Sequence, residues 1–356
     1  MNRIPVGILG ATGTVGQRFV QLLAGHPWFR VAALAASERT AGKRYADACH
    51  WLLSTPIPDG VCDLVVHPVG SELDCRVVFS ALPSAVARTV EARLAQEGYA
   101  VCSNASAHRM DADVPLVIPE VNPDHTALIG AQRQRRGWKG FIVTSANCST
   151  TQLALALKPL QDASGLRKVS VVTMQAISGA GYPGVPAMDI LGNVIPFIGG
   201  EEDKMERESL KLLGMLQGER VIDAPFVVGA QCNRVPVRDG HTECVSVGFA
   251  RQTNADEVIA ALETFRGPPE VAELPSTPAQ PVIVQTEDDR PQPLRDLDRA
   301  PTTGDSARGM PIVVGRVRPC PVLGVKFVVV GHNTLRGAAG GAIHNAELLA
   351  AQGYVC

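Results

Sequence analysis

Three glycines near the start of the chain limit its fold most strongly. Gly10, Gly13 and Gly16 lie between the apolar run Ile4–Leu9 and residues 15–23, whose apolar positions have helical spacing. Glycine permits a tight turn there and lets backbone N–H groups approach a pyrophosphate at a helix N-terminus. A purely structural turn is the alternative, but the position favours a dinucleotide-binding loop. The loop residues expected to contact the cofactor are Gly10, Thr12, Gly13, Thr14, Val15 and Gly16.

Further short apolar runs alternate with segments that can be helical. The runs are residues 31–35, 64–66, 77–80, 100–102 and 141–144, and one of the helical segments is 85–97. This alternation predicts an α/β fold with an N-terminal Rossmann-type doubly wound parallel sheet. Longer β-rich runs at 169–177, 220–228, 242–250, 313–318 and 324–331 predict a second, α+β domain with a mixed sheet.

The length of 356 residues favours two domains, since a single core rarely grows that large. We expect residues 1–147 to form the first, completed by a C-terminal helical segment at 332–356, and residues 148–331 to form the second. Residues 267–311 carry many prolines and charges. We expect this segment to be too polar for a core, and to form a surface excursion or a contact between copies of the chain.

Charge and cysteine usage exclude several classes of function. A net charge of −2 gives no field that would hold nucleic acid or a membrane surface, so a small-molecule partner is expected. No apolar run approaches the roughly 20 residues that cross a bilayer. The nine cysteines form no CxxC or Cys/His cluster, so we predict no metal site. Without an apolar signal segment near the start, reduced thiols in the cytoplasm are expected.

The turn after the second predicted strand bears on the choice of cofactor. NAD-specific sites place an acid there against the ribose 2′-hydroxyl, whereas this chain has Ser37 and Arg39, with Lys43 nearby. A hydroxyl and cations suit a 2′-phosphate, so the sequence favours NADP. Glu38 leaves NAD open.

One cysteine stands apart from the other eight. Cys148 lies between the predicted strand at 141–144 and a helical stretch, so its thiol is expected at a helix N-terminus, where a thiolate and an oxyanion are stabilised. Histidine is the usual partner of such a nucleophile, and His241 is the best placed of the eight histidines because it follows a turn and begins a strong strand. A histidine in a surface turn is the alternative.

Five segments in order along the chain carry a resemblance to a known family: GATGTVGQ, SANCST, MQAISGAG, GGEEDKMERE and RVPVRDGHTE. The chain resembles the aspartate-β-semialdehyde dehydrogenases of the archaeal and fungal-like branch. The resemblance implies an NADPH-dependent reductive dephosphorylation of aspartyl-4-phosphate to aspartate semialdehyde, in lysine, threonine, methionine and isoleucine synthesis. It also implies a catalytic and dimerisation role for the second domain, and a homodimer or homotetramer.

The same resemblance implies roles for single residues. Cys148 matches the nucleophile, His241 the acid/base, and Gln175 and Asn147 the groups that orient the substrate at the thiol. Arg234 would bind the substrate carboxylate and Glu201, or its neighbour Glu202, the amino group. Lys204 and Arg109 would receive the phosphate. Further cofactor contacts are expected from Ser80, Ala81, Ser178, Gly179, Gly181 and Asn333.

Three other functions stay open at this point. A malonyl-CoA reductase would share the nucleophile and cofactor but accept a CoA thioester, and an N-acetylglutamyl-phosphate reductase would accept a related acyl phosphate. An inactive nucleotide-sensing protein would have lost part of the Cys148, His241 and Arg234 set, which is intact in this sequence.

Overall fold

The computed structural model describes residues 3–297 and 305–356. Its first sheet has six parallel strands in the order β3-β2-β1-β4-β5-β6, the doubly wound order expected for a dinucleotide-binding domain. The strands are β1 (Ile4–Leu9), β2 (Phe29–Ala36), β3 (Val66–Pro68), β4 (Val77–Ser80), β5 (Ala100–Ser103) and β6 (Phe141–Thr144). All residues of β4, β5 and β6 are buried, as is usual for parallel strands covered on both faces.

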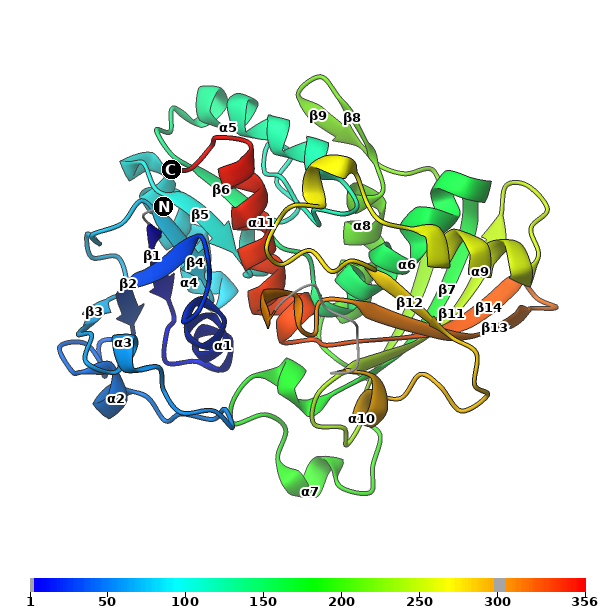
Figure 1. Cartoon of the computed structure of the whole chain (residues 1–356), viewed down its shortest axis with the longest axis horizontal. Coiled ribbons are helices and arrows are strands. Elements are labelled where there is room, and N and C mark those ends of the chain that lie inside the picture. Colours follow the sequence, from blue (N-terminus) through cyan, green and yellow to red (C-terminus); the bar gives the residue numbers. More distant parts are fainter. Residues whose placement is uncertain (1–2, 298–304) are drawn as a thin grey trace.

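Helices cover both faces of this sheet. They are α1 (Thr14–Leu23), the short α2 (Tyr45–Ala48) and α3 (Asp59–Cys62), α4 (Ser84–Glu97) and α5 (Leu128–Arg136). On one face Phe19 of α1 stacks on Phe79 of β4 with ring centroids 4.9 Å apart. The C-terminal helix α11 (Gly340–Ala351) returns to the same face, where Ile343 and Ala346 join that core. Figure 1 shows α11 in red at the centre of the molecule, beside the first sheet.

The second sheet is mixed, in the order β10-β7-β11-β14-β13-β12. Its strands are β7 (Leu166–Gln175), β10 (Val227–Arg234), β11 (His241–Phe249), β12 (Val282–Gln285), β13 (Ile312–Pro319) and β14 (Val325–Gly331). Helices α6 (Cys148–Ser164), α8 (Glu201–Leu212) and α9 (Ala255–Thr264) belong to the same part of the chain. Along β11, His241, Glu243 and Val245 are buried, whereas Cys244 is exposed. The sheet therefore has one covered face and one open face.

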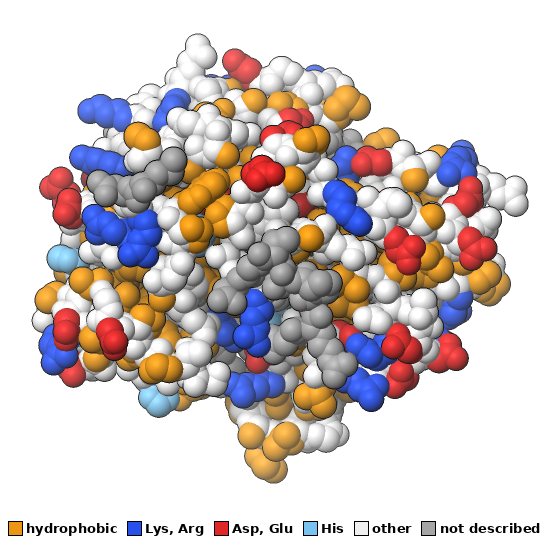
Figure 2. Space-filling model, viewed as in Figure 1, with side chains coloured by type: hydrophobic (Ala, Val, Ile, Leu, Met, Phe, Trp, Pro, Cys, Tyr) orange, Lys and Arg blue, Asp and Glu red, His pale blue; other side chains and the backbone are white. Residues whose placement is uncertain are grey.

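Small elements complete the described chain: the hairpin of β8 (Met215–Gln217) and β9 (Arg220–Ile222), and helices α7 (Ala187–Ile190) and α10 (Pro293–Asp296). None of the described helices is long and apolar enough to cross a membrane. Figure 2 shows apolar side chains over α7, at the lower tip of the molecule. These exposed apolar residues are Tyr182, Met188, Leu191, Val194 and Phe197.

Three expectations need correction, two of them about single strands and the third about the segment 267–311. Residues 220–228 form two strands rather than one, because Pro225 has no N–H to give to a ladder and the chain changes sheets there. The expected strand at 64–66 lies instead at Val66–Pro68.

The segment 267–311 was expected to be too polar for a core, but it contributes buried residues to both cores. Val271 and Leu274 are buried in the first core, and Val282 of β12 is buried in the second. Arg290 and Asp296 form a buried ion pair. The expectation was wrong because short apolar pieces of this segment pack into two different cores, although the segment as a whole is rich in proline and charge. The part of this segment at 298–304 lies outside the described residues.

Candidate active site

The glycine loop has the geometry that its sequence requires. Gly10 has a φ of 77°, which favours glycine, and α1 begins at Thr14, directly after the loop. A Cβ on Gly16 would lie 2.2 Å from the carbonyl oxygen of Gly10, so only glycine lets the helix approach the strand this closely. The free N–H groups at the start of α1 are therefore open to an anion.

A cavity of about 600 Å³ lies at the carboxyl ends of the first sheet's strands and extends to the second domain. Several of the predicted site residues line it: Thr14, Val15, Ala81, Arg109, Asn147, Cys148, Ser178, Gly179, Gly181 and Asn333. Asn333 connects two parts of its wall, because its Oδ1 accepts a hydrogen bond from the N–H of Gly240 (2.8 Å) and its Nδ2 donates to Oγ of Ser178 (2.8 Å). Residues far apart in the sequence thus share one cavity.

Other predicted cofactor residues lie elsewhere. Ser37, Arg39 and Lys43 are exposed in the turn after β2, outside the cavity wall but at the edge where a ribose would lie. Ser80 is fully buried at the end of β4 and does not line the cavity, so its side chain is not brought to the site.

Cys148 is the first residue of α6. The side chain of Asn147 caps the helix by accepting hydrogen bonds from the N–H groups of Ser149 (3.0 Å) and Thr150 (3.2 Å). Sγ of Cys148 lies 3.2 Å from Nε2 of His241, 93 residues further along the chain. The predicted pairing of these two side chains is present in the structure.

His241 is fully buried at the start of β11. Its Nδ1 accepts a hydrogen bond of 3.0 Å from the backbone N–H of Ala176. Burial, together with the nearby Arg234 and His332, lowers the pKa of His241 to about 3. The imidazole is therefore neutral at physiological pH.

The thiol of Cys148 is also neutral in this structure. Burial and the carboxylate of Glu201 raise its pKa to about 12, although Arg109 and Arg234 act in the opposite direction. Gly337 packs directly against this residue, since a Cβ on Gly337 would lie 2.6 Å from the Cβ of Cys148. The position of Cys148 is thus fixed by a close backbone contact.

Arg234 and Gln175 lie beside the pair at the ends of β10 and β7, where the two strands are in register. Nη1 of Arg234 donates a hydrogen bond of 2.7 Å to the carbonyl oxygen of Ala176. A Cβ on Gly179 would lie 2.8 Å from the same Nη1 and 3.1 Å from Nε2 of His241. Glycine at 179 leaves both groups open to a ligand.

Glu201, at the start of α8, accepts hydrogen bonds from three side chains. Its carboxylate accepts hydrogen bonds from Lys204 Nζ (2.8 Å), Asn147 Nδ2 (2.8 Å) and Gln175 Nε2 (3.4 Å). Burial alone would raise the pKa of Glu201, but these donors bring it below its usual value, so the group is ionised. Glu201, rather than Glu202, is the acid that the structure brings to the site, because Glu202 accepts from the N–H of Cys232 instead.

Two residues of the site were not predicted. Glu208, 2% exposed, accepts a hydrogen bond from Arg109 Nη1 (3.0 Å) and another from the backbone N–H of Asn147 (2.7 Å). Its spacing of seven from Glu201, which places both on one face of α8, is a signal that could have found it. Asn104 lines the cavity, and neither of its buried amide atoms has a partner in the described part of the chain. Nothing in the sequence distinguishes it.

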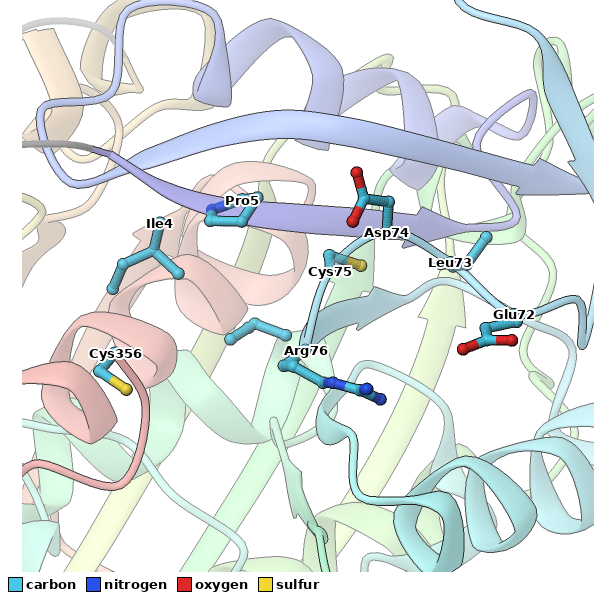
Figure 3. Close-up of a pocket in the computed structure, with 9 residues that line it drawn as sticks. Ile4, Pro5, Glu72, Leu73, Asp74, Cys75, Arg76 and Cys356 are labelled. Carbon is cyan, nitrogen blue, oxygen red and sulfur yellow. The ribbon is translucent and has the colours of Figure 1, made fainter.

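A second cavity, of about 560 Å³, lies at the opposite ends of the strands of the first sheet (Figure 3). Its wall combines Ile4 and Pro5 at the start of β1 with Cys75, Arg76 and the C-terminal Cys356. These are the amino ends of parallel strands, whereas ligands of such sheets bind at the carboxyl ends. The cavity at Cys148 is therefore the candidate dinucleotide site.

Fold and site together define a Rossmann-type dehydrogenase with a cysteine–histidine pair beside the cavity at the carboxyl ends of its first sheet. Residues 5–129 match the family model for the NAD-binding domain of semialdehyde dehydrogenases, and residues 157–336 match the model for their dimerisation domain. The chain belongs to the semialdehyde dehydrogenase family.

Similar proteins come from archaea and fungi. The aspartate-semialdehyde dehydrogenase of Archaeoglobus fulgidus is 53% identical over 348 residues, covering 98% of each chain. That of Cryptococcus neoformans is 45% identical over 366 residues, covering 99% of this chain and 98% of the relative. The crystal structure of the Candida albicans enzyme with NADP superposes with a TM-score of 0.89 at 42% identity, covering 99% of this chain and 100% of that one. The archaeal and fungal-like resemblance and the α/β fold are confirmed.

Proposed function

We propose that this chain reduces L-aspartyl-4-phosphate to L-aspartate 4-semialdehyde with NADPH, releasing phosphate, through a thioester on Cys148. The observation that carries the proposal is the 3.2 Å contact between Sγ of Cys148 and Nε2 of His241 at the wall of the dinucleotide cavity. A cysteine suits this chemistry because its thiolate is a good nucleophile toward an acyl phosphate and a good leaving group afterwards. The relatives named above as aspartate-semialdehyde dehydrogenases support the choice of substrate.

The residues of the cavity fit NADP. The N-terminus of α1 offers free N–H groups to the pyrophosphate, and the unpartnered amide of Asn104 offers a donor and an acceptor to the ligand. Arg39 and Ser37 would meet the 2′-phosphate from the turn after β2, which agrees with the NADP bound to the Candida albicans enzyme. When bound, the cofactor supplies the hydride.

Two anionic ends of the substrate need cations. Arg234 is buried and its remaining donors would bind the α-carboxylate beside Gly179, as a bidentate partner. Arg109 and Lys204 share a smaller cavity of about 190 Å³ and would receive the phosphate. Each of these two cations already has a carboxylate partner, Glu208 or Glu201, which weakens its hold on the phosphate and favours release.

The remaining residues of the site would orient the reacting carbonyl. Glu201 is ionised and would meet the substrate's ammonium group, while Gln175 and Asn147, both hydrogen-bonded to Glu201, would hold the acyl group over Sγ. The capped N-terminus of α6 adds N–H groups that favour negative charge on sulfur and on the oxyanion.

The organisation of the enzyme is part of the proposal. We assign residues 1–147 and 332–356 to the cofactor domain and 148–331 to the catalytic and dimerisation domain, with a homodimer or homotetramer as the working form. The exposed apolar side chains around α7 and the match to a dimerisation domain support an oligomer. All nine cysteines are described as free thiols, which supports a reducing, cytoplasmic location.

The test supplies aspartate semialdehyde, phosphate and NADP and follows NADPH by absorbance, with malonyl-CoA plus NADPH as a parallel reaction. We expect turnover in the first reaction alone, and none after Cys148→Ser. Cys62→Ser, which changes a half-buried thiol remote from the cavity, is the matched control and should retain wild-type turnover. Reduction of malonyl-CoA as the faster reaction, or full activity of Cys148→Ser, would contradict the proposal.

A further inference from the structure

Lys211, in the last turn of α8, is a buried lysine whose ammonium group binds three backbone carbonyls. It is 5% exposed, whereas lysine is almost never fully buried unless it is paired. Its Nζ donates hydrogen bonds to the carbonyl oxygens of Arg109 (2.7 Å), Asp111 (2.9 Å) and Val114 (2.9 Å). An ammonium group has three N–H donors, so none is left for a ligand.

The three carbonyls belong to one tight loop, residues 109–114, which follows the short helical turn Ser106–His108. Successive turns fold this loop, because the N–H of Asp111 donates to the carbonyl of His108 (3.1 Å) and the N–H of Val114 to that of Asp111 (3.2 Å). A buried carbonyl without a donor is costly, and Lys211 supplies donors to three carbonyls at once. The loop 109–114 is therefore attached to α8 through its backbone.

The face of α8 that carries Lys211 also carries Lys204. Positions 201, 204, 208 and 211 are three or four residues apart, so their side chains lie along one face of the helix. Lys204 and Arg109 line the same cavity of about 190 Å³. Lys211 attaches the backbone of Arg109 to α8, and Lys204 belongs to α8 itself. The helix thus fixes the separation of these two cations.

A second set of contacts attaches the loop 109–114 to α5. Arg136 of α5 donates to Asp113 (2.6 Å) and to Asp111 (3.1 Å), and Nδ1 of His108 lies 2.9 Å from the Asp111 carboxylate. These ion pairs do not involve α8. Loss of Lys211 should therefore leave the loop folded against α5 and release its position relative to α8.

We propose that Lys211 is a positioning residue for the phosphate group: it ties the loop 109–114 to α8, so that Arg109 and Lys204 are held at the separation that one phosphate requires. The inference rests on the phosphate role proposed above for these two cations. A guanidinium binds phosphate through directed, often paired hydrogen bonds, so a small displacement of the Arg109 backbone weakens the contact. Lys211 acts through Arg109 and does not touch the phosphate, since its three donors are occupied.

The first test removes the donors and keeps a long side chain. Lys211→Met should raise the KM for phosphate about 10-fold in the oxidation of aspartate semialdehyde, because a charge-assisted hydrogen bond is weakened. The KM values for NADP and aspartate semialdehyde should stay within about twofold of wild type. Lys158→Met is the matched control and should change none of the three, since Lys158 pairs with Asp162 on α6 and lines neither cavity of the site.

A role in folding alone predicts a different result. The loss of Lys211 would then lower the stability to urea, and the three KM values would change together or not at all. Either outcome in a folded Lys211→Met variant would refute the inference.

The second test uses the pH dependence of the wild-type protein. Burial lowers the pKa of Lys211 to about 8, although nearby carboxylates oppose this shift. A neutral amine has two N–H groups for three carbonyls, so the loop loses one attachment above about pH 8. The charged and titratable groups around Lys211 are Asp111 and Asp113 of the loop, Glu208 of α8, Asp223 before β10, and His125.

Calorimetry of inorganic phosphate binding to the NADP-loaded protein measures this effect. Between about pH 7 and about pH 9.5, the Kd for phosphate should rise severalfold more in wild type than in Lys211→Met, which lacks the titrating group. The ionisation of phosphate itself is the same in both titrations. Parallel curves would refute the inference. If Lys211→Met does not fold, the wild-type Kd values for phosphate and NADP are compared instead, and equal changes in both would refute it.

The two tests separate this inference from the proposed function. If the wild-type protein binds phosphate with the expected pH dependence but does not oxidise aspartate semialdehyde, only the proposed substrate is wrong. If it turns over and Lys211→Met keeps the wild-type KM for phosphate, only the role of Lys211 is wrong.

Discussion

Replacing Gly337 by alanine tests whether the position of Cys148 is set by the backbone contact between the two residues. Gly337 lies in the π-helical turn Leu335–Ala339, and an added Cβ would lie 2.6 Å from Cβ and 2.8 Å from Cα of Cys148. Both are parts of a helix start and not the end of a flexible side chain. The strain must therefore be relieved by moving one element relative to the other.

Two effects of opposite sign can be compared. Alanine in place of glycine favours a helix by roughly 1 kcal/mol. A normal carbon–carbon contact of about 3.5–4.0 Å requires a shift of roughly 1 Å from the 2.6 Å approach, and such overpacking costs about 1–3 kcal/mol. A shift of about 1 Å at a reacting group costs on the order of 10²-fold in rate. We expect Gly337→Ala to lower kcat by about 100-fold while changing stability by no more than about 2 kcal/mol.

The assay combines NADPH formation from aspartate semialdehyde and phosphate with urea unfolding. Gly130→Ala is the matched control, because Gly130 lies in α5 with no atom within 4 Å of an added Cβ, so it should keep wild-type kcat and gain up to about 1 kcal/mol. If Gly337→Ala turned over within twofold of wild type and unfolded like it, the contact would not position the nucleophile.

Three further outcomes follow from particular side chains. Glu208→Ala removes the carboxylate partner of the buried Arg109, so urea unfolding should show a loss of about 3–5 kcal/mol, and the KM for phosphate should fall because that partner weakens the hold of Arg109 on the phosphate; a small change in both would contradict these roles of Glu208. Arg39→Ala should raise the KM for NADPH about 10-fold and leave that for NADH unchanged, since a charge-assisted hydrogen bond is worth about 1.5–3 kcal/mol; equal effects on both cofactors would remove the 2′-phosphate role. Burial raises the pKa of Glu243, so above about pH 4.5 the unfolded chain ionises this group while the folded chain does not, and stability falls as pH rises. Glu243→Gln should therefore unfold at higher urea than wild type at pH 7 and like it below about pH 4.5, and a constant difference would refute this.

Local sequence patterns were enough to predict the elements whose structure depends on residues close together in the chain. The glycine loop, α1 and the start of α6 follow from turn chemistry and apolar spacing over a few residues. The contact between Cys148 and His241 was harder to predict, because 93 residues separate the two side chains. Only their places at a helix start and at a strand start indicated a common site. The fold class and the contact between Cys148 and His241 were therefore predictable from short segments together with family motifs.

Contacts that depend on the packing of distant elements were not predictable. In the sequence, Glu208 resembles the other charged residues of a polar helix. Its hydrogen bonds with the Asn147 N–H and with Arg109 arise only because α8 packs close to α6. Val282 stands among prolines and charges, yet β12 adds it to a core formed mostly by other strands. The hydrogen bond from the Ala176 N–H to Nδ1 of His241 involves a backbone group, which no side-chain pattern in the sequence indicates.

Cys148 begins the second domain and contacts a turn of the first, and buried charges hold that turn in place. The π-helical turn that contacts Cys148 contains Arg336, whose Nη2 donates to Oε2 of Glu120 at 2.5 Å, with both side chains at most 1% exposed. A buried ion pair adds little net stability over apolar packing, but it tolerates few alternative arrangements, because a slip leaves a charge without a partner. His344 of α11 lies 3.6 Å from the same carboxylate, so the C-terminal helix is tied to the same point. The chain thus has a charged contact of low net energy next to the close approach of Gly337 to Cys148, where a shift of the turn would change the position of the thiol.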